Sequence, residues 1–183
     1  MSFARSIWRA ASLAGLIAIA AACGTSAATA GETQTVKAFA FIETAGNVLP
    51  SGPDSTRMVG TLQGPFFIDS GHGPVDAGNL RCIANMKADV SSGRQTGEGS
   101  CVLTARDGAN LFADWTCEGV KFVGCRGDFT ITGGDGRLDG VSGGGGMTTR
   151  VSDFAVLPEG ETGLASTTSR GIVFWDEFVF VMP

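Results

Sequence analysis

Apolar and polar positions alternate in short runs from residue 34 onward, and turns rich in glycine separate the runs. A period of two is typical of a half-buried β-strand, because successive side chains point to opposite faces. We find no convincing helical period in this part of the chain. The pattern therefore predicts an all-β chain with strands at Gln34–Glu43, Thr56–Gln63, Pro65–Asp69, Leu80–Val90, Gly97–Arg106, Asn110–Glu118, Gly124–Thr132, Met147–Leu157 and Gly171–Met182.

The spacing of these segments predicts one antiparallel domain. Short strands joined by turns of Gly, Ser, Asp and Asn indicate consecutive hairpins, which close into a barrel or stack as a sandwich. Loops are expected at Leu49–Asp54 and Ser70–Pro74, and the glycine run Gly143–Gly146 is expected to precede its strand. Because no internal repeat or linker interrupts the pattern, residues 31–183 are predicted to form a single domain.

The first 30 residues predict a cleavable leader. Arg5 and Arg9 make the start basic, and the apolar run Ala10–Ala22 follows. That run is shorter than the roughly 20 residues of a membrane span and is typical of a signal peptide. The A-x-A site at Ala28–Ala30 places the expected cleavage after Ala30, so residues 1–30 are predicted to be removed. The mature chain is then expected in the periplasm or outside the cell, with no transmembrane span.

A lipid anchor is the alternative to simple cleavage. The segment Ala20–Gly24 resembles a lipoprotein box, in which Cys23 would become the lipidated N-terminus. Ala20 stands where such boxes usually carry leucine. Under this alternative the protein is tethered to a membrane.

The charge balance argues against nucleic-acid binding. The chain has 13 basic and 18 acidic residues and a net charge of −5, and loss of the two leader arginines makes it more acidic. Affinity for a phosphate backbone comes from Lys and Arg, and no basic stripe is present. The scattered acids are typical of a solubilising surface.

Four cysteines follow the leader, and an even number in an exported chain predicts two disulfides. The local pairings Cys82 with Cys101 and Cys117 with Cys125 are favoured, because each pair flanks one predicted turn. Pairing of Cys101 with Cys117 is an open alternative, since it is symmetrical about another turn. A zinc site would need tighter spacing and more histidines than the single His72, so no metal and no cofactor are expected.

One segment resembles a known family. Phe129–Gly143 is similar to the strand–GGxGxxxG–strand signature of the allene oxide cyclase and dirigent barrels. It is still more similar to small exported bacterial proteins with the pattern W-x-C-x-G…G-C-x-G-x-F-x-x-x-G-G, which here runs from Trp115 to Gly134. The resemblance implies a lipocalin-like closed barrel of about eight strands, with room inside for side chains or one small ligand. It carries over no catalytic residue. The motif's glycines are interpreted as a structural turn, because they supply positive φ or close backbone approach; they are Gly133, Gly134, Gly136 and Gly140.

Three charged residues near the cysteines are candidate ligand-binding residues. Alternation places Asp114 and Glu118 on one face of their strand and Trp115 on the other. If the acidic face points inward, the two acids and Arg126 form a small polar constellation in the barrel. The competing and favoured interpretation is a solvated outer face with ion pairs between strands. His72 is interpreted as a solvated loop residue.

The sequence supports three function hypotheses of different classes. The first is a non-enzymatic envelope barrel that binds a small apolar ligand or acts structurally, because residue types suited to catalysis are scarce. The second is a cyclase or isomerase acting on a small hydrophobic substrate inside the barrel. The third is a protein-interaction module or homodimer, since the strand Val173–Met182 is apolar on both faces.

Overall fold

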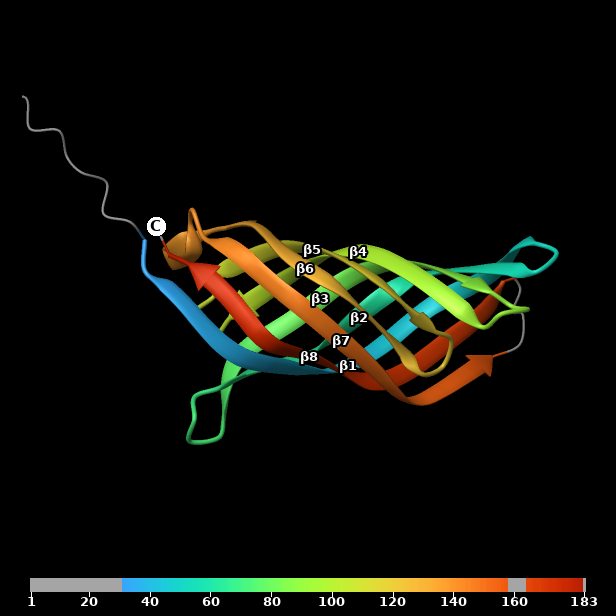
Figure 1. The fold of residues 1–183 in the computed structure, drawn as a ribbon, viewed down its shortest axis with the longest axis horizontal. Coiled ribbons are helices and arrows are strands. Elements are labelled where there is room, and N and C mark those ends of the chain that lie inside the picture. The colour runs from blue at the N-terminus through green and yellow to red at the C-terminus, as the bar shows by residue number, and fades with distance from the viewer. Residues whose placement is uncertain (1–30, 158–163, 183) are drawn as a thin grey trace, which may run out of the picture.

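The computed structural model describes residues 31–157 and 164–182, which form one closed antiparallel barrel (Figure 1). Each strand pairs with its neighbours in the chain, and the last strand pairs with the first. The predicted all-β fold, a single closed barrel of eight strands with two disulfides, is confirmed. The strands are β1 Thr33–Gly52, β2 Ser55–Asp69, β3 Pro74–Asp89, β4 Arg94–Ala105, β5 Asn110–Val120, β6 Gly124–Gly134, β7 Ser142–Leu157 and β8 Ala165–Val181, with a short 3-10 helix η1 at Gly136–Leu138.

Most strands are longer than the sequence predicted. The segments expected at Thr56–Gln63 and Pro65–Asp69 are one strand, β2. Pro65 has no N–H to donate, and the pairing of β2 with β1 is interrupted at this point while the pairing with β3 runs through it. The loop expected at Leu49–Asp54 shrinks to a tight turn, and the glycine run 143–146 lies inside β7.

The two ends of the barrel differ in how they are filled. At one end, which we call the base, lie the start of β1, the end of β8 and η1 (Figure 1). Near the base, rings from three strands pack edge to face around Trp175, whose centroid is 5.6 Å from that of Phe66, 5.3 Å from Phe129 and 6.0 Å from Phe178. Such pairs stabilise a core beyond the area they bury, and they plug this half of the barrel.

The opposite end, which we call the mouth, carries the hairpin turns β1–β2, β3–β4 and β5–β6 and the adjoining ends of β7 and β8. Trp115 of β5 lies between the base plug and this end, against Gly97 and Gly99 of β4. A Cβ on Gly99 would lie 2.7 Å from Trp115 Nε1, and one on Gly97 would lie 3.2 Å from Trp115 Cζ3. The two glycines therefore give the indole its place inside the wall.

Both disulfides lie on the inner surface. Cys82 is bonded to Cys101, directly opposite across β3 and β4, and Cys117 is bonded to Cys125 across β5 and β6. All four cysteines are buried. The favoured local pairing is the one present, and the alternative Cys101–Cys117 pairing is wrong, because Cys101 lies opposite Ala113 rather than Cys117 in the β4–β5 register.

Within the described residues, no helix is both long enough and apolar enough to cross a membrane.

Candidate ligand-binding cavity

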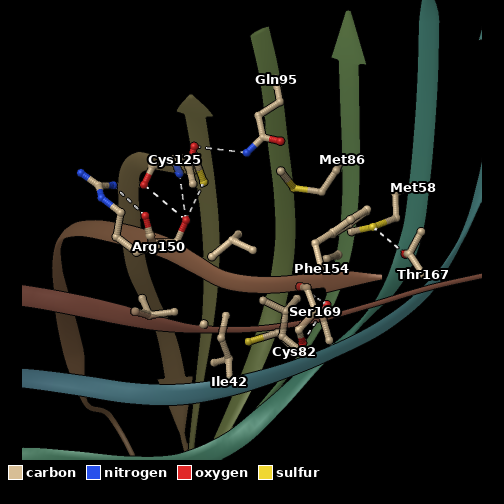
Figure 2. Close-up of a pocket in the computed structure, with 18 of the residues that line it drawn as sticks. Ile42, Met58, Cys82, Met86, Gln95, Cys125, Arg150, Phe154, Thr167 and Ser169 are labelled. Atoms are coloured by element: carbon tan, nitrogen blue, oxygen red, sulfur yellow. Dashed lines mark hydrogen bonds between the residues drawn. The ribbon is translucent and has the colours of Figure 1, made fainter. Parts of the chain in front are cut away.

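A cavity of about 220 Å³ occupies the mouth half of the barrel (Figure 2). It forms because alternation along each strand turns every second side chain inward, while the bulkiest rings are concentrated toward the base. An engineered dry cavity of about 150 Å³ is large enough for benzene, so this one has room for a small apolar molecule. The deeper lining is almost entirely apolar: Ile42, Leu62, Leu80, Cys82, Ala84, Met86, Cys101, Trp115, Phe129, Met147, Val173 and Trp175.

Most of the uncharged polar side chains in the wall already have partners. The hydroxyls of Thr44 and Ser169 lie 2.6 Å apart, and the Thr167 hydroxyl donates to Met58 Sδ at 3.4 Å (Figure 2). The Thr149 hydroxyl accepts the backbone N–H of Cys125 at 2.9 Å, and Gln95 Nε2 donates to the Gly124 carbonyl at 3.2 Å. Because these groups are satisfied, the wall presents mainly apolar surface to a ligand.

One buried donor is an exception. Trp175 is 1% exposed, and its indole N–H has no hydrogen-bond partner among the described residues. The rings of Phe66 and Phe129 pack against it. Most buried polar groups are paired, so this donor is an exception, enclosed within the aromatic plug below the cavity.

The charged residues that line the cavity are cations. They are Lys121, Arg150 and Arg170, and all belong to the mouth half. Arg170 Nε lies 3.2 Å from Glu43 Oε1, whereas Lys121 and Arg150 make no ion pair among the described residues. The Lys121 ammonium lies 4.8 Å from the centroid of the Phe122 ring. Arg150 and Arg170 are exposed and follow Thr149 and Ser169, whose side chains point inward, so the two guanidinium groups lie on the outer side of the wall.

The charged residues proposed from the sequence lie on the outer surface. Asp114, Glu118 and Arg126 are exposed and do not line the cavity. The Ser100 hydroxyl donates to Asp114 Oδ1 at 2.6 Å, and Glu118 lies opposite Arg126 in the β5–β6 register. The inward positions of β5 are taken by its apolar residues instead, so this polar group faces solvent.

The glycine turn of the family-like motif connects β6 to β7 at the base. Gly136 and Gly140 have φ of +59° and +77°, a region that favours glycine. Asp135 accepts from the Asn110 side chain and backbone at 2.9 and 2.6 Å, and these bonds lower the pKa of its carboxyl. Gly133 and Gly134 are the last residues of β6. The turn is tied to the neighbouring β4–β5 turn by the Arg137–Asp107 ion pair.

His72 is exposed in the β2–β3 loop at the base. No group of three or more His, Cys, Asp or Glu side chains in the described part of the chain could hold a metal ion. Cys23 lies outside the described residues.

A cluster of phenylalanines covers part of the outer wall. Phe39 stacks on Phe67 at 5.2 Å between centroids, and Phe41 meets both rings edge-on at 5.7 and 6.0 Å. Phe174 of β8 is the register neighbour of Phe39. Phe41 and Phe174 are exposed, so β8, β1 and β2 share an apolar outer surface.

The sequence reasoning did not identify the residues that line the cavity. The cysteines could have identified them. Leu80, Ala84 and Met86 lie on the same face of their strand as Cys82, because they are an even number of residues from it, and bridged cysteines are usually buried. Taking every second residue from Cys82 along β3 would have identified the inner face of this strand.

No protein-family model matches the chain. No curated protein matches it either. Among solved structures, the chain is similar to the pterocarpan synthase dirigent protein GePTS1, with 11% sequence identity and a TM-score of 0.42 over 80% of this chain and 93% of that one.

Proposed function

We propose that this protein is an exported, non-enzymatic barrel that binds a small apolar or amphipathic ligand in the cavity at its mouth. The observation that carries the proposal is the cavity of about 220 Å³ with apolar walls and hydrogen-bonded polar groups. Removal of residues 1–30 on export is part of the proposal, and the two disulfides are typical of proteins outside the reducing cytosol.

Catalysis is less well supported than binding. A cyclase or isomerase would need acids or other polar groups beside its substrate. Among the described residues the cavity has no Asp or Glu in its lining, and its cations belong to the mouth half rather than the floor. Asp114, Glu118 and Arg126 are exposed outside the barrel.

Binding is tested with bromooctanol, whose bromine quenches tryptophan fluorescence at short range. Trp115 and Trp175 both line the cavity, so we expect saturable quenching. Ala84→Phe should weaken binding at least tenfold, because Ala84 is 4% exposed on the inner face and a phenyl ring would fill the space. Ile83→Phe is the matched control, since Ile83 is the next residue of β3 but is 64% exposed on the outer face.

Two results would contradict the proposal. One is quenching that rises without saturation, and the other is equal affinity in the wild type and the Ala84→Phe variant. Thermal unfolding of both variants shows whether Ala84→Phe has kept the barrel, and Met86→Phe provides a second variant that fills the same cavity.

Protein interaction is a second candidate function. The phenylalanine cluster of β8, β1 and β2 favours it, because contiguous exposed apolar surface marks interaction sites. A second copy of this chain is the partner that we propose for this surface.

A further inference from the structure

The turns at the two ends of the barrel differ in chemistry. The base turns are polar and joined by ion pairs between Arg106 and Asp76 and between Arg137 and Asp107. Each hairpin at the mouth instead carries exposed large apolar side chains. Turns are ordinarily built from Gly, Pro, Asn, Asp and Ser, so the need to form a turn does not explain these apolar side chains. We call them the apolar rim: Leu49, Val90, Val120, Phe122, Val123, Val156 and Leu157.

Phe122 belongs to the rim against the preference of its own backbone. Its φ is +65°, and it is the one non-glycine residue with positive φ in the part of the chain that the structure describes. Asn or Gly fits this conformation better than a bulky side chain. The ring is 52% exposed, packs on Phe154 at 4.6 Å between centroids and lies under the Lys121 ammonium. Such strain is a reason to look for function.

The shape of the rim indicates what covers it. Its members stand on separate hairpin ends around the opening of an apolar cavity, rather than on one flat face. A fluid lipid layer can accommodate separate projecting side chains and also meet the opening between them. Apolar side chains beside cations are typical of proteins that bind the interface of a bilayer.

The charges at the mouth favour an anionic lipid surface. Lys121 lies on the β5–β6 turn beside Phe122, and Arg150 is exposed on the neighbouring stretch of β7, although the chain is acidic as a whole. Asp54 and Asp89 lie on the β1–β2 and β3–β4 turns, and hydrogen bonds from Ser91 and Ser92 lower the pKa of Asp89 to about 2. Lys121 is therefore the cation best placed beside Phe122 to approach lipid phosphates.

We propose that the mouth of the barrel docks on the surface of an anionic lipid bilayer, with Phe122 and Val123 inserted at the headgroup–acyl boundary. This goes beyond ligand binding, because a cavity can be filled from solution without any contact with a membrane. Docking would bring the cavity opening against the layer in which apolar molecules concentrate.

The test is co-sedimentation of the exported protein with vesicles of phosphatidylglycerol and phosphatidylethanolamine, compared with vesicles of phosphatidylcholine. Phe122→Asn removes the ring and relieves the positive φ, so the variant should fold at least as well while its partition coefficient falls about tenfold. Val123→Ser should show a smaller loss. Val75→Ser is the matched control at the base, because Val75 is 53% exposed and Val123 is 54%.

Binding to the anionic vesicles that weakens with salt, with losses confined to the rim variants, supports docking. Absence of vesicle binding by the wild type, or an equal loss in Val75→Ser, would overturn it. Sedimentation velocity without lipid tests the alternative that a second copy of this chain covers the rim. Self-association that Phe122→Asn abolishes would make the rim a contact between copies and would overturn docking. Saturable quenching by bromooctanol without vesicle binding would overturn docking alone and leave the proposed ligand site standing.

Discussion

At the scale of single residues, the interior of this barrel depends on positions where a side chain is missing. Gly99 lies directly opposite Trp115 in the β4–β5 register. A Cβ there would lie 2.0 Å from the Ile83 carbonyl oxygen as well as 2.7 Å from the indole nitrogen. Since one of those atoms is backbone of the neighbouring strand, the wall has little room to adjust.

We therefore expect Gly99→Ala to lower the free energy of unfolding by about 1–3 kcal/mol, the usual cost of overpacking. Urea unfolding followed by circular dichroism measures it. Gly146→Ala is the control, because nothing lies within 4 Å of a Cβ at that position. Equal stability of the two variants would show that Gly99 is not required for the packing of Trp115.

Residue identity alone did not decide which face of a strand is inside. The alternation of β5 separated Asp114 and Glu118 from Trp115 and Cys117, and the interpretation favoured from the sequence put the two acids on the solvated face without excluding the inward one. The structure buries the face of Trp115 and Cys117. Which of the two alternating faces points inward depends on the neighbouring strands, because the inward side chains must pack against those of the other strands across the barrel.

At the scale of the strands, the succession of hairpins could be predicted, but the breaks between strands and the strand lengths could not. Glycine and proline at positions 64, 65 and 143–146 look like breaks in a local pattern, yet they lie inside β2 and β7. A strand in a closed barrel has a hydrogen-bonding neighbour on each side, so one interrupted ladder does not end it. That support comes from residues distant in sequence, which no local window contains.

The disulfides act at this scale, because each fastens one hairpin from the inside. We expect Cys82→Ala with Cys101→Ala to lower the free energy of unfolding by about 3 kcal/mol, and Cys117→Ala with Cys125→Ala by about 2.5 kcal/mol. The bridges span sequence separations of 19 and 8 residues, and the longer loop loses more entropy when closed. Urea denaturation of the two double variants checks the order, and a larger loss from the shorter loop would contradict the entropic explanation.

At the scale of the whole molecule, the difference between base and mouth could not be predicted from the sequence. The rim residues come from the ends of consecutive antiparallel strands between positions 49 and 157. Alternating strand direction puts these ends at one edge of the sheet, and closure of the barrel arranges them around one opening. The same closure gathers the aromatic plug at the other end and leaves the cavity between the plug and the rim.

The predicted cleavage site lies next to the base of the barrel in sequence. The described chain begins at Gly31, beside the end of β8 at the base. We expect the intact mass of the exported protein to correspond to a chain starting at Gly31, with four thiols that become available for alkylation only after reduction. Mass spectrometry with and without reduction measures both.

A mass that begins at a diacylated Cys23 would contradict cleavage after Ala30, and it would also change where the mouth can bind. Residues 23–30 can reach at most about 28 Å when fully extended. β1 alone has 20 residues, which rise about 3.3 Å each and tilt by about 40° in such a barrel, so the barrel is longer than the tether. An anchored protein would keep its base within about 28 Å of the membrane that carries it, so its mouth could not meet that membrane end-on. Its mouth could then dock only on a different lipid surface, whereas a cleaved protein is free to dock on any.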